Sequence, residues 1–227
     1  MKKIIFILFV FTIDILAQEY TVEKVSGNVQ ALIGTSENWI KVAAGQKLYG
    51  TDLISTDEKS FVQLAAKENR FILQSNSVLG LSSIKKMTLN DLLLALAMEE
   101  IRNVPKTKSN QLTRNTAVYG NEVSTGKAAP VTVSDIGLKK INGAKQLAQN
   151  GFTESAILVA KETFRKYPET KAQINDRVYF ADLMIRLNLM NEAETELNQI
   201  SSQRLSVQDK KEVTSRLDKI KEAALKR

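Results

Sequence analysis

The stretch that decides the fold runs from Val25 to Leu81 and reads VSGNVQALIGTSENWIKVAAGQKLYGTDLISTDEKSFVQLAAKENRFILQSNSVLGL. Short runs of apolar and β-branched residues are separated by clusters of glycine, asparagine, serine and aspartate. This pattern is typical of short strands joined by tight turns. The expected strands are 25–33, 39–42, 53–56, 61–66, 71–73 and 78–81. Their near-regular spacing predicts a small all-β sandwich or roll.

Single residues in this stretch have structural expectations. Gly27, Gly45 and Gly50 are expected where the backbone needs a positive φ or a close approach, because glycine has no Cβ. Asp52 is expected to accept hydrogen bonds from nearby backbone in its own turn. Trp39, the single tryptophan of the chain, is expected to be a core residue rather than a platform for a ligand.

The order of these residues resembles the FecR-type periplasmic domain. The matching positions are Gly27, Val29, Trp39, Gly45, Leu48, Asp52, Ile54, Thr56, Ser60, Val62, Leu64, Ile72, Leu73, Asn76 and Ser77. A shorter echo of the family lies at 114–120, and Gly50-Thr51-Asp52 stands where the family usually runs from glycine straight into aspartate. The resemblance implies a small β domain in the periplasm, of a kind found in sensors that pass a periplasmic signal to a membrane partner.

The N-terminus predicts export. Lys2 and Lys3 precede an apolar run, and Ala17 follows it at a position suited to cleavage. Residues 1–17 are therefore interpreted as a signal peptide, because the run is short for a membrane span of roughly 20 residues. An uncleaved membrane anchor is the alternative. The expected location is the periplasm or the outside of the cell.

Composition excludes several reaction classes. The chain has no cysteine and no histidine, so it has no thiol nucleophile, no Ser-His-Asp triad and no histidine-bound zinc. We expect no cofactor and no catalytic residue. A carboxylate-based enzyme is the weaker alternative, although Glu99 and Glu100 are expected to be a solvated helix end. The net charge is +7, but no basic stretch interleaved with aromatics supports nucleic-acid binding.

Residues 88–133 are expected to join two domains. Thr88 is a good N-cap with Asp91 three residues on, and Pro105 ends the helix. Its apolar face is expected to pack on the sheet or on the C-terminal helices, with a partner or dimer face as the alternative. That face consists of Leu89, Leu92, Leu93, Leu96 and Ile101. The segment 104–130 is expected to return a strand at 116–119 and then act as a linker.

From residue 134 the apolar period becomes helical. Helices are expected over 136–150, 153–167 and 174–187. A further helix is expected to end at Ile200, and a capping helix to begin at Ser206. Gly151 between helices, Ala156 five residues later and Pro168 at the end resemble a tetratricopeptide repeat. A second unit is centred on Ala193, with Asn188 in place of the glycine. The resemblance implies stacked helical hairpins with a concave peptide-binding face.

The predicted fold is thus α+β. Its parts are a signal peptide 1–17, a FecR-like β domain 18–87, a helix and linker 88–133, and a helical domain 134–227. The concave face would carry Asn142, Lys145, Gln149, Asn175, Tyr179, Asp182 and Arg186. Such side chains suit peptide backbone and carboxylates. We expect a non-enzymatic envelope adaptor that binds another envelope protein or peptide segment, with peptidoglycan or glycan binding as the alternative, and membrane contact only through an uncleaved signal.

Overall fold

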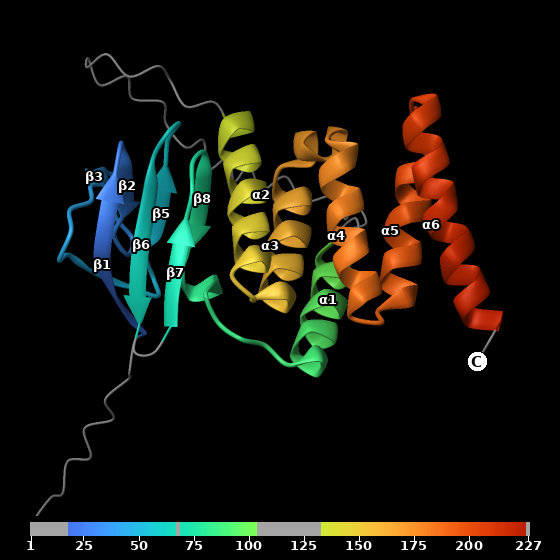
Figure 1. Ribbon diagram of the computed structural model, residues 1–227, viewed down its shortest axis with the longest axis horizontal. Coiled ribbons are helices and arrows are strands. Elements are labelled where there is room, and N and C mark those ends of the chain that lie inside the picture. The colour runs from blue at the N-terminus through green and yellow to red at the C-terminus, as the bar shows by residue number, and fades with distance from the viewer. Residues whose placement is uncertain (1–17, 67–68, 104–132, 226–227) are drawn as a thin grey trace, which may run out of the picture.

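The computed structural model describes residues 18–66, 69–103 and 133–225, and these have a mixed α+β fold (Figure 1). Within them, eight strands form two four-stranded antiparallel sheets, accompanied by six α-helices. The predicted signal peptide 1–17 and the predicted strand at 116–119 with its linker lie outside the described residues. In the described ranges, no helix combines the length and the apolar character that a membrane span requires.

The two sheets pack face to face around a core built by alternation along each strand. Sheet A has the order β4-β1-β6-β7 and sheet B the order β3-β2-β5-β8. The strands of sheet A are β1 (Glu19–Ser26), β4 (Lys47–Tyr49), β6 (Phe61–Ala66) and β7 (Asn69–Leu73). Those of sheet B are β2 (Val29–Leu32), β3 (Trp39–Lys41), β5 (Leu53–Thr56) and β8 (Ser77–Gly80). Val22 and Leu64 of sheet A and Ile54 of sheet B are fully buried between them.

The expected single strand 25–33 is wrong, because the chain crosses there from one sheet to the other. β1 belongs to sheet A and β2 to sheet B, and the turn between them contains Gly27 at φ 74°. Gly45 also has a positive φ, 85°, as expected. Gly50 does not, and a Cβ there would come no closer than 3.9 Å to other atoms. β4, three residues long, was not expected, since too few residues lie in it to show alternation.

Asp52 accepts hydrogen bonds from nearby backbone, as expected. Its side chain is 1% exposed and accepts from the backbone N–H groups of Gly34 and Tyr49, both at 2.8 Å. Its own carbonyl accepts from Leu81 N at 2.9 Å. The buried carboxylate thus holds two turns of the sandwich, and the backbone carbonyl of the same residue holds the chain that leaves β8.

We expect Asp52→Ala to lower the free energy of unfolding by about 2 kcal/mol, because two N–H groups would lose their acceptor in a buried place. Urea unfolding of the full chain measures this. Asp218→Ala, on the exposed face of the last helix, is the control and should change stability by no more than about 0.5 kcal/mol. Equal stability of the two variants would contradict the role assigned to Asp52.

Helix α1 (Leu89–Asn103) begins with a capping box. Asp91 N donates to Thr88 Oγ1 at 3.1 Å, and Thr88 N donates to the Asp91 carboxylate at 3.1 Å. Leu92 and Leu96 are buried, and α1 packs on α3, which confirms packing on the C-terminal helices. The expected burial of the whole apolar face is wrong, because only one edge of that face is covered. The exposed members are Leu89, Leu93 and Ile101.

The remaining helices stack one after another away from the sandwich (Figure 1). They are α2 (Val133–Gln149), α3 (Thr153–Lys166), α4 (Ile174–Arg186), α5 (Met190–Ser201) and α6 (Val207–Leu225), with short 3-10 turns η1 (Leu81–Ser83) and η2 (Pro168–Ala172). Gly151 joins α2 to α3 at φ 84°, and Asn188 adopts φ 62° between α4 and α5. Ala156 and Ala193 are fully buried, consistent with close helix contact at both predicted positions.

Helix α2 closes one open side of the sandwich, where the edge strands β7 and β8 lie. A Cβ on Gly143 would stand 2.3 Å from the Val78 carbonyl oxygen, so the helix backbone lies directly on β8. The Asn142 amide donates to Asn76 O at 2.8 Å. The Asn150 amide donates to Ile72 O at 3.2 Å and accepts from Ile72 N at 3.3 Å, as a paired strand would. The sandwich and the helices therefore share one hydrophobic cluster, and an exposed strand edge is covered.

Candidate functional site

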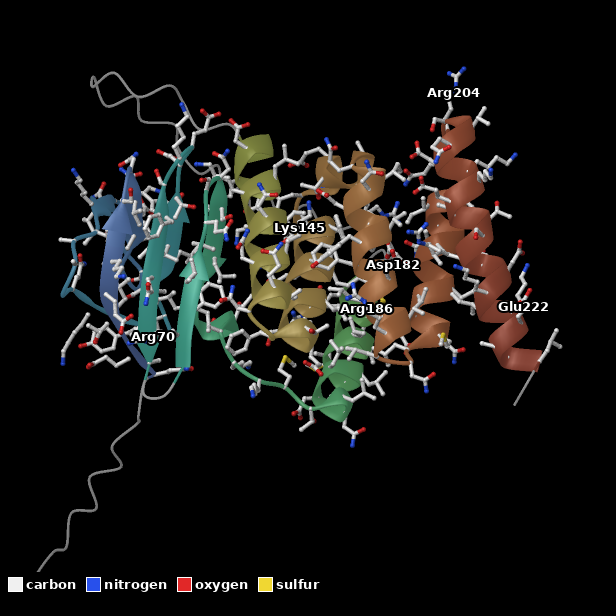
Figure 2. All side chains as sticks on the ribbon, in the orientation of Figure 1. Arg70, Lys145, Asp182, Arg186, Arg204 and Glu222 are labelled. Atoms are coloured by element: carbon white, nitrogen blue, oxygen red, sulfur yellow. The ribbon has the colours of Figure 1, made fainter. Side chains whose placement is uncertain are left out.

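Helices α2, α4 and α6 are linked to one another by ion pairs. Lys145 on α2 pairs with Asp176 on α4, and Asp182 on α4 pairs with Arg216 on α6. Lys145, Asp182 and Arg186 project on the same side of the stack (Figure 2). This side corresponds to the face that the hairpin-repeat resemblance predicted to bind a peptide.

Between α4 and α6 this face is hollowed. The hollow has a volume of about 510 Å³. Its floor contains apolar groups from both sides, and its rim contains charged groups. Ile185, Arg186 and Met190 line one side, and Arg216, Lys219 and Ile220 line the other. We call this the α4–α6 hollow.

Some of the charged side chains that line the hollow are in ion pairs and others are not. Arg216 binds the Asp182 carboxylate with two nitrogens, at 2.8 and 2.9 Å, and this pair raises the pKa of Arg216. Among the described residues, Arg186 donates only to the backbone carbonyl of Asp182, at 3.4 Å. Arg186 and Lys219 are exposed, and neither has an ion pair with any carboxylate of the described residues. Two uncompensated cations beside an apolar floor fit a peptide with a carboxylate next to an apolar side chain.

The residues predicted for the concave face separate into groups. Asp182 and Arg186 line the hollow, and Tyr179 lies on the same helix face, since positions i, i+3 and i+7 share a side. Tyr179 is half-buried with its ring edge-on to Phe180, 5.2 Å between centroids, and burial raises its pKa while Arg186 opposes the rise.

The other predicted residues lie outside the hollow. Asn142 is engaged with the β8 side of the sandwich, at Asn76. Lys145 is neutralised by Asp176. Gln149 and Asn175 are exposed and remain available to a ligand. The structure thus concentrates the candidate site at the C-terminal half of the predicted face.

Sequence reasoning missed the contribution of α6, which was interpreted only as a cap. Val213 and Ile220 are buried against the stack. Arg216 lies four residues before Ile220, so it stands at the border of the apolar stripe and reaches Asp182. A basic residue at the border of a capping stripe was the signal that could have indicated the site.

A second group of charges lies in a cleft of about 90 Å³ between α1, α3 and α5. Glu99 was expected to be solvated, but it is 6% exposed and pairs with Arg165 at 2.5 Å and Arg102 at 2.7 Å. Burial raises the pKa of Glu99, but the two arginines outweigh burial and the pKa lies below its usual value. The expectation failed because α3 brings Arg165 against the end of α1.

Three aromatic residues of the sandwich are exposed. Trp39, expected in the core, is 39% exposed because β3 is an edge strand of sheet B. Tyr49 and Phe61 are similarly exposed, at 42% and 39%. Three aromatic side chains are therefore accessible to a ligand on the β part of the molecule.

Within the described ranges, no cluster of three or more acidic side chains is arranged to hold a metal ion. No family model matches the chain, and comparisons with curated proteins and with solved structures gave no significant match.

Proposed function

We propose that this protein is a non-enzymatic module of the cell envelope that binds an acidic segment of a partner protein in the α4–α6 hollow. The carrying observation is the pair of uncompensated cations, Arg186 and Lys219, beside the apolar side chains of Ile185, Met190 and Ile220. The signal-like segment 1–17 and the FecR-like and tetratricopeptide-like sequence patterns support an exported adaptor.

A binding role is also supported by the ionisation of the buried carboxylates. Glu99 and Glu196 both line the small cleft between α1, α3 and α5, but both have lowered pKa values because basic side chains neutralise them. A general acid–base pair needs two carboxyl groups with pKa values pushed apart, so that one retains its proton near neutral pH. These two glutamates are instead both ionised, as in ion pairs that hold helices together.

Saccharide binding is the second candidate function. The observation that favours it is the exposure of Trp39 and Tyr49 on the β part, since aromatic faces exposed on a sheet suit the apolar side of a sugar. Peptidoglycan would be the source of such a saccharide in the envelope. This candidate uses the sandwich, whereas the adaptor function uses the helical stack.

The adaptor function is tested by crosslinking in intact cells followed by capture of the tagged full-length chain. We expect a defined partner protein with the wild type. Arg186→Ala/Lys219→Ala should weaken binding of that partner by at least about tenfold, because two charge-assisted contacts are removed. Titration of the purified chain with acidic peptides taken from the captured partner gives the affinity.

The matched control is Arg204→Ala. Arg204 is exposed and lies near the start of α6, at the end opposite Glu222 (Figure 2). It should bind the partner like the wild type. If the double variant binds equally well, the hollow is not the site; if only wall polymer is captured, the adaptor function itself is contradicted.

A further inference from the structure

A third cavity lies where sheet B meets the helices. It has a volume of about 160 Å³ and is bounded by Leu53, Gly80 and η1 on the β part and by α2 and α3 on the helical part. We call it the sheet–helix cavity. At about 30 Å³ for each water, it has room for roughly five waters or for a small polar group of a ligand.

Gly80 has no side chain and so leaves this cavity open, although the packing around it does not require a glycine. Its backbone is extended, with φ −76° and ψ 128°. A Cβ at Gly80 would meet only the hydroxyl oxygens of Ser82 at 3.8 Å and Ser83 at 4.0 Å, which is ordinary contact. Neither a turn nor a close approach therefore explains the glycine, whereas the open volume above it does.

Lys140 supplies an uncompensated positive charge to the cavity. It is half-buried on α2, and burial together with Lys166 lowers the pKa of its ammonium group, against a weaker opposing effect of Glu162. Lys166 is paired with Glu162 at 2.5 Å, but no carboxylate of the described residues forms an ion pair with Lys140. The three groups leave one net positive charge, which a carboxylate matches better than a doubly charged phosphate.

Two hydroxyl groups complete the polar lining. Ser82 and Ser83 follow Gly80 in η1 and line the cavity. Neither hydroxyl is engaged in a hydrogen bond with other described residues, so both can donate to an oxyanion held by Lys140.

The strand register of sheet B connects this cavity to Trp39. Leu32 pairs with Trp39 on one side and with Leu53 on the other, and Leu53 pairs with Gly80. These four residues form one row on the outer face, with Leu32 and Leu53 partly exposed. Four strands spaced about 4.8 Å apart give a row of roughly 14 Å.

A polar row runs beside the apolar one. Lys41, Gln30 and Ser55 are paired across the same strands, two residues along from the apolar row. Adjacent apolar and polar rows match a saccharide, which presents a carbon–hydrogen face and a rim of hydroxyl groups.

We propose that the outer face of sheet B binds an acidic saccharide, with its carboxylate in the sheet–helix cavity on Lys140 and its sugar rings along the row that ends at Trp39. This site rests on the saccharide-binding candidate and is independent of the α4–α6 hollow.

The test uses the fluorescence of Trp39, the only tryptophan of the full chain. The probe is the disaccharide of N-acetylglucosamine and N-acetylmuramic acid, which carries one carboxylate. The matched neutral sugar is the disaccharide of N-acetylglucosamine, which lacks the lactyl acid. We expect the acidic disaccharide to shift the emission and to bind at least about tenfold more tightly than the neutral one.

Two variants test the residues separately. Lys140→Gln removes the charge and Gly80→Leu fills the cavity, and each should weaken binding of the acidic disaccharide about tenfold. Lys210→Gln, exposed on α6, is the matched control and should bind like the wild type. Thermal unfolding of each variant verifies that it is folded.

The possible outcomes distinguish a failure of this proposed site from a failure of saccharide binding itself. If the acidic disaccharide binds wild type and both cavity variants equally, saccharide binding stands and this site is wrong. If neither disaccharide binds, both the saccharide candidate and this inference are overturned, while partner capture through Arg186 is untouched. If triglutamate replaces the disaccharide as the ligand with the same dependence on Lys140, the ligand is an acidic peptide and the saccharide proposal is wrong.

Discussion

Gly143→Leu is expected to lower the free energy of unfolding by about 3 kcal/mol, at the upper end of the usual cost of overpacking. The position of a Cβ at Gly143 is 2.3 Å from the Val78 carbonyl oxygen and 3.1 Å from the carbonyl carbon. Both atoms belong to the backbone of β8, so no side chain can rotate away to make room. The helix must instead move off the strand edge that it covers.

Gly143→Ala makes the test sharper, because intrinsic helix propensity predicts the opposite sign. In an exposed helix, alanine would stabilise by about 1 kcal/mol relative to glycine. Here the added methyl group enters the space of the Val78 carbonyl, so we expect a net destabilisation of about 1–2 kcal/mol. Chemical unfolding monitored by far-UV circular dichroism measures both variants.

The control for Gly143 is Gly80→Ala, which adds one methyl group at the end of β8 itself but meets nothing closer than 3.8 Å. It should change stability by no more than about 0.5 kcal/mol. In hydrogen exchange, the Gly143 variants should lose protection in β8 and at Ile72 N, which Asn150 covers. A Gly143→Ala protein as stable as the wild type would mean that α2 does not lie on β8.

The sequence patterns predicted local structure well where a single turn or face decided it. Asp52 has the predicted contact to the backbone of its own turn, at Tyr49 N three residues away. Its second contact, to Gly34 N 18 residues away, was not predicted. Asn188 stands where the repeat pattern predicted a glycine, and its φ of 62° is one that asparagine tolerates. The alternation of buried and exposed residues in β5 and β6 follows the same local rule.

Features that depend on pairing between distant segments could not be predicted in this way. Trp39 is exposed because β3 is an edge strand, and strand order is not encoded by alternation. Glu99 is buried because Arg165, 66 residues away, reaches it. The close approach at Gly143 was not predicted from the sequence, because its partner Val78 is visible only in three dimensions.

Prediction of the candidate site is limited in the same way, because part of the site depends on contacts between distant segments. Tyr179, Asp182 and Arg186 lie on one helix, so their common face follows from helical spacing. Arg216 and Lys219 join them only because α6 packs beside α4 through α5. Asn142 had the same predicted role as Arg186, yet its amide donates a hydrogen bond to Asn76 O at the edge of the sandwich.

Glu196→Gln is expected to have the largest effect of the variants considered, a loss of about 3–5 kcal/mol in the free energy of unfolding. Glu196, 4% exposed on α5, binds Arg177 at 2.6 Å and Lys161 at 2.6 Å. Arg177 is 1% exposed, and its Nη1 has no hydrogen-bond partner among the described residues. Removing the carboxylate leaves a guanidinium charge in the core with no counterion.

Replacing the whole pair should be much less harmful than breaking it. In Arg177→Met/Glu196→Leu, neither buried charge of this pair remains, and Lys161 is exposed enough to turn toward water. We expect the double variant to recover most of the stability lost in Glu196→Gln. Glu222→Gln, exposed near the end of α6 (Figure 2), is the matched control and should stay within about 0.5 kcal/mol of wild type.

The pH dependence gives a second, independent measure of the same pair. Burial raises the pKa of Glu196, but Lys161 and Arg177 outweigh burial, so the folded-state pKa lies below the usual value. A carboxylate with a lowered folded pKa stabilises the fold above its unfolded pKa, about 4.3, and loses that contribution as pH falls through the folded pKa. Wild-type stability should therefore fall below about pH 5 more steeply than that of Glu196→Gln, and the gap between the two should narrow with acid. Parallel curves in urea unfolding from pH 7 to pH 3 would show that Glu196 is not the ionised partner of Arg177, whereas a residual slope in the variant is expected from Glu99, whose pKa is also lowered.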